Sequence, residues 1–153
     1  MTERAGPGLR TVHEGDREGF AAFLLRVRAA GLDNRELMAA VESVPRRDFV
    51  EAQYRHLVMA PRTIPIGCGE TLEGLDLQAR IIDALSVDGG SRVFEIGTGS
   101  GYTAAVMARL AKRVYTVERF RTLHQDVMQR FRHLGIGNII AAQADGSAGS
   151  EDG

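Results

Sequence analysis

The chain has 153 residues, enough for one domain with a hydrophobic core. Hydrophobic residues make up 44% of the sequence and charged residues 25%, which is the composition of a globular protein rather than a disordered one. The 19 basic residues nearly balance the 20 acidic residues, which argues against a broad surface for nucleic acid or for an anionic membrane.

The sequence favours a cytoplasmic location. No apolar run approaches the roughly 20 residues of a membrane span, and the N-terminus lacks the apolar segment of a signal peptide. The single cysteine, Cys68, excludes an internal disulfide framework and fits a reducing compartment. We therefore expect a cytoplasmic protein that binds neither nucleic acid nor a membrane.

The N-terminal part of the chain is predicted to be helical after a flexible tail of residues 1–16. Apolar residues recur at helical spacing between Glu18 and Ala30, which indicates a first helix. A second helix has its start signals at Asp33, the expected N-cap, and ends before Pro45. Both helices are expected to be packing elements.

The segment from Pro45 to Thr71 is predicted to form loops and short extended pieces, because prolines and glycines interrupt it. Arg46 and Arg47 could bind a phosphate, but two solvated arginines after a helix are the favoured interpretation. Cys68 could act as a nucleophile only beside a base or a positive field. An exposed loop cysteine is favoured over catalysis.

The remainder alternates helical and strand patterns, as in an α/β domain with parallel strands. The expected helices cover residues 75–85, 104–110 and about 120–134, and the expected strands cover residues 93–96, 114–117 and 138–144. The residues expected to point inward from the first of these helices are Leu77, Ile81, Ile82 and Leu85.

Three glycines between the first strand and its helix indicate a ligand site. Gly97, Gly99 and Gly101 would let backbone amides approach a ligand at a helix N-terminus. The expected ligand contacts of this loop are Gly97, Thr98, Gly99, Ser100, Gly101 and Tyr102.

Each of the three strands ends at a carboxylate. Glu95 precedes the loop, Glu118 lies 21 residues beyond Gly97, and Asp145 closes the third strand beside Gly146. Because the carboxyl ends of parallel strands share one edge, we expect all three carboxylates there. Glu118 would then accept hydrogen bonds from ribose hydroxyls, and Asp145 would reach an adenine amino group.

The glycine spacing distinguishes between ligands. A dinucleotide fingerprint reads G-x-G-x-x-G, whereas this loop reads G-x-G-x-G with Glu95 just upstream. A carboxylate at Glu95 would repel a pyrophosphate but suits a ligand with an ammonium or sulfonium charge. S-adenosylmethionine is therefore the favoured cofactor. A nicotinamide cofactor and a glycine turn without ligand are the alternatives, and no metal site is assigned.

Several motifs resemble the protein-L-isoaspartate O-methyltransferase family. They are Glu95–Thr103, Arg113–Glu118 and Asp145–Ser147, with Val44–Val50 and Pro65–Thr71 in the upstream half. The resemblance covers roughly residues 18–147. It implies methyl transfer from S-adenosylmethionine to the α-carboxylate of isoaspartyl residues in damaged proteins or peptides, a protein-repair reaction.

The resemblance also implies a fold and a domain division. The expected fold is α/β and Rossmann-like, the S-adenosylmethionine-dependent methyltransferase type. Only the first half of its parallel sheet, three strands, is expected here, after a helical N-terminal region. Residues 17–146 would form one domain, divided into a helical and substrate-loop region over 17–88 and a cofactor-binding half over 89–146. A flexible tail is expected over 147–153.

The sequence departs from the family pattern on the substrate side. Glu73 stands where a serine hydroxyl is expected to touch the reacting carboxylate, and an ionised glutamate cannot donate a hydrogen bond. Either Thr71 supplies the hydroxyl, or Glu73 is protonated or points away, or the substrate differs. Thr71 and Glu73 are the candidate catalytic residues.

The early end of the sheet is the second departure. With three strands only, the first strand is an unprotected edge that invites self-association. A catalytically impaired or truncated cofactor-binding module is the alternative function.

Overall fold

The computed structural model describes residues 12–149, which form a helical N-terminal region followed by a parallel sheet with its own helices. The α-helices are α1 (Arg17–Ala29), α2 (Arg35–Ser43), α3 (Leu75–Ala84), α4 (Tyr102–Leu110) and α5 (Arg121–His133). The strands are β1 (Ile64–Pro65), β2 (Thr71–Leu72), β3 (Arg92–Ile96), β4 (Arg113–Glu118) and β5 (Ile139–Gln143). The short 3-10 helices are η1 (Glu14–Asp16), η2 (Arg46–Phe49), η3 (Ala52–Leu57), η4 (Gly67–Gly69) and η5 (Gly146–Ala148).

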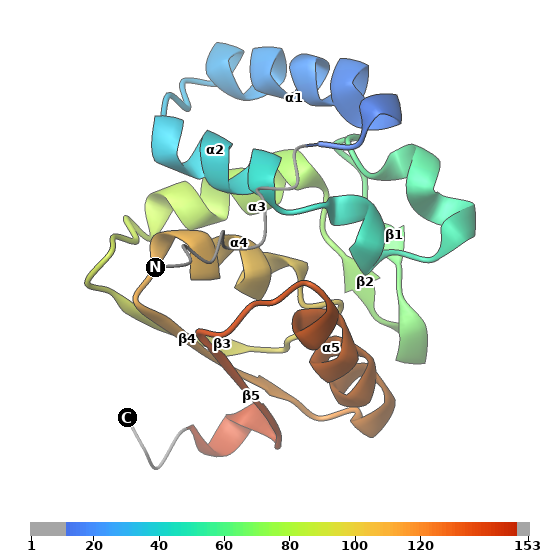
Figure 1. Ribbon diagram of the computed structural model, residues 1–153, viewed down its shortest axis with the longest axis vertical. Helices are drawn as coiled ribbons and strands as arrows, with labels where there is room; N and C mark the ends of the chain where they lie inside the picture. The colour runs from blue at the N-terminus through green and yellow to red at the C-terminus, as the bar shows by residue number, and fades with distance from the viewer. Residues whose placement is uncertain (1–11, 150–153) are drawn as a thin grey trace, which may run out of the picture.

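The main sheet has the order β3-β4-β5, with both pairs parallel, which confirms the expected three-stranded half. Helices α4 and α5 connect these strands and pack on one face of the sheet (Figure 1). α1, α2 and α3 form a further layer beyond α4, while β1 and β2 pair as a small antiparallel hairpin at the side.

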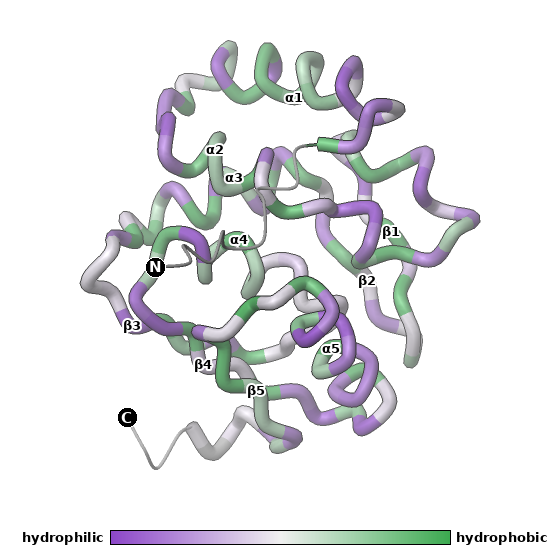
Figure 2. Tube along the Cα trace, viewed as in Figure 1, coloured by the Kyte–Doolittle hydropathy of each residue, from purple (hydrophilic) through white to green (hydrophobic). Residues whose placement is uncertain are grey.

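α5 illustrates how the sequence places its helices. Leu123, Val127 and Phe131 recur every four residues and are buried against the sheet. The rest of the helix is largely hydrophilic, as the purple tube along α5 in Figure 2 shows. One apolar stripe on a polar helix fixes which side faces the sheet, and the sequence periodicity predicted this helix correctly.

The opposite face of the sheet is largely bare. Phe94, Tyr115 and Ile140 stand in one row across the three strands, and Phe94 and Ile140 are 41% and 47% exposed. Ile96 in the next row is 64% exposed. Parallel sheets are normally covered on both faces. Within residues 12–149, the short η5 lies against this face, where Gly146 approaches the Ile96 side chain.

The predicted inward face of α3 is wrong for three of its four residues, and only Ile82 is buried as predicted. Leu77, Ile81 and Leu85 are 47%, 48% and 56% exposed. The buried stripe is instead Leu75, Gln78, Ala79 and Ile82. This face is buried because the Gln78 side chain forms hydrogen bonds with η2 and α4. Hydrophobic periodicity does not reveal such polar contacts.

The predicted N-cap of α2 is also wrong, by one residue. Asn34, not Asp33, accepts a hydrogen bond from Leu37 N at 3.0 Å. The Asn34 amide also donates to Asp83 Oδ1 of α3 at 2.8 Å. Both residue types are good caps, and the second bond, to a neighbouring helix, favours Asn34.

The structured region begins earlier than the predicted tail boundary. Val12 and Asp16 are 7% exposed, and Asp16 forms a two-point ion pair with Arg47 at 2.6 and 2.9 Å. The expectation of a flexible tail over residues 12–16 is therefore corrected, as is that of a solvated Arg47. Of the tail predicted over 147–153, Ser147 and Ala148 belong to η5, so that boundary is corrected as well. The other predicted tail residues, 1–11 and 150–153, lie outside the described residues. None of the helices within residues 12–149 has the length and apolar character needed to cross a membrane.

The cap geometry gives a direct test. Asn34→Ala should lower the free energy of unfolding by roughly 1 to 2 kcal/mol, because it removes the cap and the bond to Asp83. Asp33→Ala, one residue away and exposed, should change it by less than about 0.5 kcal/mol. Urea unfolding of both variants measures the difference, and an equal loss in both would contradict the assignment.

Candidate functional site

The loop between β3 and α4 has a backbone that only glycine adopts readily. Gly97, Gly99 and Gly101 have φ angles of +87°, +55° and +85°. At Gly101 a Cβ atom would also stand 2.9 Å from Phe131 Cζ, so α5 leaves no room for a side chain there. The loop is therefore held close to α5 as it enters α4.

Glu118 at the end of β4 holds this loop in place. Its carboxylate is buried, with the residue 4% exposed, and it accepts two backbone hydrogen bonds. Gly99 N donates to Oε2 and Phe120 N donates to Oε1, each at 2.9 Å. Hydrogen bonds to a charged acceptor are stronger than neutral ones. Glu118 thus ties the glycine loop to the end of β4.

Glu95 lies beneath the loop, on the helix-covered face of the sheet, beside its register partner Thr116. Thr116 Oγ1 donates to Glu95 Oε2 at 2.6 Å, and the Thr98 hydroxyl lies 2.6 Å from the same Thr116 oxygen. Burial raises the pKa of Glu95 to about 7, with a smaller lowering effect from the Thr116 hydrogen bond and a smaller raising effect from the Glu118 charge. Glu95 is therefore a carboxyl group that titrates near neutrality.

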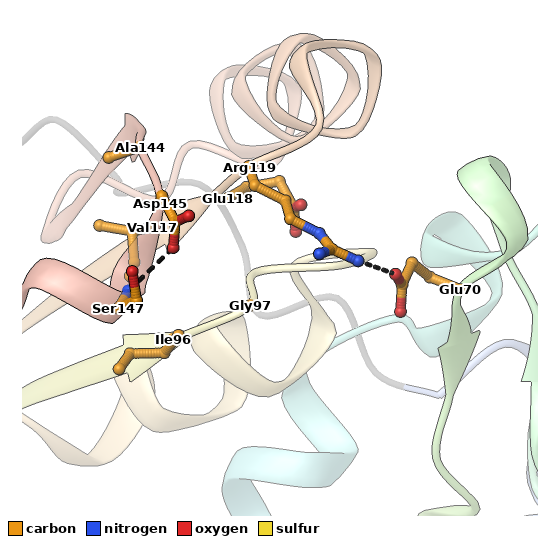
Figure 3. A pocket seen from close by; sticks show the side chains of 10 residues that line it. Glu70, Ile96, Gly97, Val117, Glu118, Arg119, Ala144, Asp145 and Ser147 are labelled. Atoms are coloured by element: carbon orange, nitrogen blue, oxygen red, sulfur yellow. Dashed lines mark hydrogen bonds and ion pairs between the residues drawn. The ribbon is translucent and has the colours of Figure 1, made fainter.

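A cavity of about 290 Å³ opens at the carboxyl rim of the sheet. Figure 3 shows it between the ends of β3 and β4 on one side and η5 on the other. Its lining residues are Glu70, Ile96, Gly97, Val117, Glu118, Arg119, Ala144, Asp145, Gly146 and Ser147. The cavity therefore combines apolar walls with several acceptors at one edge.

Two polar contacts shape the cavity walls. Asp145 Oδ1 accepts a hydrogen bond from Ser147 N at 2.9 Å, which begins η5 and lowers the Asp145 pKa, with a smaller contribution from the Arg119 charge. Arg119 reaches across to Glu70, whose Oε1 is 3.2 Å from Arg119 Nη2 (Figure 3). This exposed ion pair joins the rim of the sheet to the segment before β2.

Of the sequence-predicted ligand residues, Gly97, Glu118, Asp145 and Gly146 line the cavity. Glu95 does not, because its carboxylate is held beneath the loop by Thr116, on the face opposite Ile96. The expectation that all three carboxylates gather on one rim is therefore corrected for the Glu95 side chain.

The other predicted loop residues support the loop from inside. Thr98 and Ser100 are each 5% exposed, and the Ser100 carbonyl accepts a hydrogen bond from Arg130 Nη1 at 2.7 Å. Tyr102 is 1% exposed and packs edge-on against Phe49 at 5.4 Å between ring centroids. The predicted ligand contact of the Tyr102 ring is corrected to a core contact.

The two candidate catalytic residues, Thr71 and Glu73, follow the lining residue Glu70 in the sequence but do not line the cavity themselves. Thr71 pairs with Pro65 in the β1–β2 hairpin, and both Thr71 and Glu73 are exposed. Within residues 12–149 the Glu73 carboxylate makes no hydrogen bond, while the Glu73 carbonyl accepts one from Arg46 Nη2 at 2.6 Å. Glu73 thus faces solvent, and its backbone is the anchored part.

Sequence reasoning missed five polar residues of this region. Glu70, Arg119 and Ser147 line the cavity, while Arg46 and Gln78 anchor the segment beside it. Arg119 directly follows Glu118, and Glu70 lies within the motif Pro65–Thr71, so the sequence could have indicated both residues. Arg46 was interpreted as solvated, and this interpretation is wrong because the residue is 1% exposed.

The raised pKa of Glu95 predicts a pH dependence of stability. In the unfolded chain Glu95 ionises near pH 4.5, but in the folded protein it keeps its proton until about pH 7. Between pH 4.5 and about pH 7 the folded state therefore binds more protons than the unfolded state. The contribution of Glu95 to the free energy of unfolding falls as the pH rises through this range. Relative to Glu95→Gln, the protein should lose up to about 3 kcal/mol between pH 4.5 and pH 8. Urea unfolding of both proteins across this range measures the loss, and a pH-independent difference would contradict it.

The chain is similar in sequence to proteins of one known family. The family model described as Protein-L-isoaspartate(D-aspartate) O-methyltransferase (PCMT) matches residues 21–153. A protein-L-isoaspartate O-methyltransferase of Rhizobium meliloti (strain 1021) is 45% identical over 125 residues, which are 82% of this chain and 61% of that protein. One of Parvibaculum lavamentivorans is 37% identical over 139 residues, covering 91% and 62%. The chain thus spans about three fifths of the length of these relatives.

Solved structures share the fold. A structure named protein-L-isoaspartate O-methyltransferase superposes with a TM-score of 0.71 and 26% identity, over 83% of this chain and 42% of that one. A putative enzyme of the same name from Plasmodium falciparum, in complex with S-adenosyl-L-homocysteine, gives 0.67 and 20% identity, over 86% and 65%. These matches establish the Rossmann-like methyltransferase fold of the chain.

Proposed function

Because the chain belongs to the protein-L-isoaspartate(D-aspartate) O-methyltransferase family, we propose that it transfers a methyl group from S-adenosylmethionine to the α-carboxylate of an isoaspartyl residue in a damaged protein. The observation that carries this proposal is the cavity at the carboxyl rim, lined by Gly97, Glu118 and Asp145. It lies where doubly wound sheets bind nucleotide ligands.

The cavity suits the adenosine half of the cofactor. Glu118 uses each carboxylate oxygen once, for Gly99 N and Phe120 N, and each oxygen keeps a further lone pair for a ribose hydroxyl. Asp145 stands exposed at the opposite wall, where its second oxygen could accept a hydrogen bond from an adenine amino group. The G-x-G-x-G spacing, in place of G-x-G-x-x-G, disfavours a pyrophosphate and therefore a nicotinamide cofactor.

The chemistry needs alignment more than acid–base catalysis. An oxygen of the acceptor carboxylate attacks the methyl carbon in line, the carbon–sulfur bond breaks, and its electron pair stays on sulfur. The products are a methyl ester and S-adenosylhomocysteine. The site must hold the two partners at near-attack distance and exclude water.

The acceptor carboxylate is assigned to the segment of residues 71–73. The exposed Glu73 side chain favours the alternative in which it points away, so Thr71 is left as the hydroxyl donor. In this division residues 17–88 supply the acceptor side and residues 89–146 supply the cofactor side of one domain.

The partners of the reaction would be proteins or peptides with isoaspartyl residues. The near balance of 19 basic and 20 acidic residues supports a protein acceptor over nucleic acid. A cytoplasmic location belongs to the same proposal, since a single exposed free cysteine, Cys68, suits a reducing compartment. Fractionation of cells that produce the tagged chain tests the location.

Self-association through the sheet is the further partner proposal. Within residues 12–149 the outer edge of β3 is unpaired, and Phe94 and Ile140 are exposed on the bare face of the sheet; both surfaces favour pairing with another chain. Sedimentation of the wild type should show association that weakens when both residues become serine. Leu25→Ser, at the 70% exposed residue of α1, is the control. A wild type that is monomeric at all concentrations would refute association.

Methyl transfer itself is the direct test of the function. The purified chain, incubated with S-adenosylmethionine labelled in the methyl group, should label an isoaspartyl peptide and should not label its aspartyl counterpart. The label should be lost as methanol in mild base, because the product is a methyl ester.

The opposite results are equally informative. Equal labelling of both peptides would refute isoaspartyl specificity. Binding of S-adenosylhomocysteine without any transfer would favour the alternative, a catalytically impaired module that retains the cofactor site. The chain's coverage of about three fifths of its relatives is the observation that keeps this alternative in view.

A further inference from the structure

Arg46 is a buried cation with no acidic partner. It opens η2 and is 1% exposed, and no carboxylate of residues 12–149 lies within ion-pair distance of it. Burial lowers its pKa, and Tyr102, whose ring lies 4.4 Å from Arg46 Cζ, partly offsets this effect. A buried charge without a counter-ion is unfavourable. Its presence calls for an explanation in the groups that it binds.

The guanidinium bridges two segments that are distant in sequence. Arg46 Nη2 donates to the Glu73 carbonyl at 2.6 Å, and Nη1 donates to Gln78 Oε1 of α3. Gln78 Nε2 in turn donates to Thr103 Oγ1, in the first turn of α4, at 2.7 Å. Three consecutive hydrogen bonds therefore connect residue 73 to the helix that follows the glycine loop.

The backbone after Glu73 also packs against the backbone of residues 61 and 62. At Gly74 a Cβ atom would stand 2.8 Å from both Arg62 N and Pro61 C, so the two backbones are in direct contact. Residues 73 and 74 thus contact both this backbone and the Arg46 guanidinium. Arg46 and Gln78 supply the hydrogen bonds that link the segment to α4.

We propose that Arg46 is a positioning residue for the methyl acceptor. Its hydrogen bond to the Glu73 carbonyl holds residues 71–73 in place. Its hydrogen bond to Gln78, which in turn bonds Thr103, fixes their position relative to the start of α4. This proposal rests on the proposed function, in which residues 71–73 receive the acceptor carboxylate and the glycine loop receives the cofactor. An in-line reaction is sensitive to such placement, since a misplacement of about 1 Å can slow it by about 100-fold.

The planar guanidinium is suited to this role. It presents donors to two acceptors in a fixed geometry, whereas a lysine ammonium is a point charge on a flexible stem. The Tyr102 contact further fixes the plane of the fork, because the ring is itself packed against Phe49. The residue would therefore act through the geometry of its two bonds rather than through its charge.

Steady-state kinetics and cofactor binding separate positioning from general stability. Arg46→Met should raise the KM for an isoaspartyl peptide by about 10- to 100-fold and lower kcat. The Kd for S-adenosylhomocysteine should stay within about twofold of the wild type, because the cavity residues keep their contacts. Arg47→Met is the matched control on the same 3-10 helix, and it should leave the peptide KM unchanged.

Two further variants keep the test valid if Arg46→Met folds poorly. Gln78→Met retains the bond between Arg46 and Glu73 but removes the link to Thr103, and it should raise the peptide KM by a smaller factor. Arg46→Lys retains the charge without the fork, and it should not restore the wild-type KM. Full restoration by lysine would overturn the proposal.

Amide hydrogen exchange supplies a readout that does not depend on turnover. In Arg46→Met the amides of residues 71–73 should exchange faster, while those of α4 exchange as in the wild type. Unchanged exchange at residues 71–73 would overturn the proposal, as would an equal rise in the peptide KM and the S-adenosylhomocysteine Kd. A wild type that transfers no methyl group but shows the exchange response would refute the proposed function and support the positioning.

Discussion

The carboxylate of Glu118 is the contact on which the site depends. It takes its two hydrogen bonds from Gly99 N and Phe120 N, so it joins the glycine loop, the end of β4 and the start of α5 in one buried group. Without it the loop would keep its positive φ angles but lose its tie to the neighbouring strand. Glu118 also lines the cavity, which links the integrity of the loop to the proposed ligand recognition.

Polar contacts join α1 and α2 to α3, and α3 to α4. Arg26 of α1 bonds Asp76 of α3 at 2.8 Å, and Asn34 of α2 bonds Asp83 of the same helix. Gln78 continues this series to α4. α3 therefore connects the proposed acceptor side with the cofactor side. Its outward Leu77 and Ile81 are exposed.

Local patterns predicted the order of helices and strands, because strand, glycine turn and helix each have short-range signals. They did not predict the buried face of α3, since Gln78 is buried only where Arg46 and Thr103 are available as partners. Asp33 and Asn34 satisfy the same capping rule, and a bond across to Asp83 selects the second. The position of Glu95 was open to prediction. Ile96 pairs in register with Val117 on the cavity face, so strand alternation places Glu95 on the other.

Calorimetric titration with S-adenosylhomocysteine is the most direct test of the central claim, that Glu118 both fixes the loop and receives the ligand. The wild type should bind, and Glu118→Ala should bind about 10- to 100-fold more weakly, since hydrogen bonds to a charged group contribute roughly 1.5 to 3 kcal/mol. Glu36→Ala, on the exposed side of α2, should bind as the wild type does. Equal affinity of the wild type and Glu118→Ala would contradict the account.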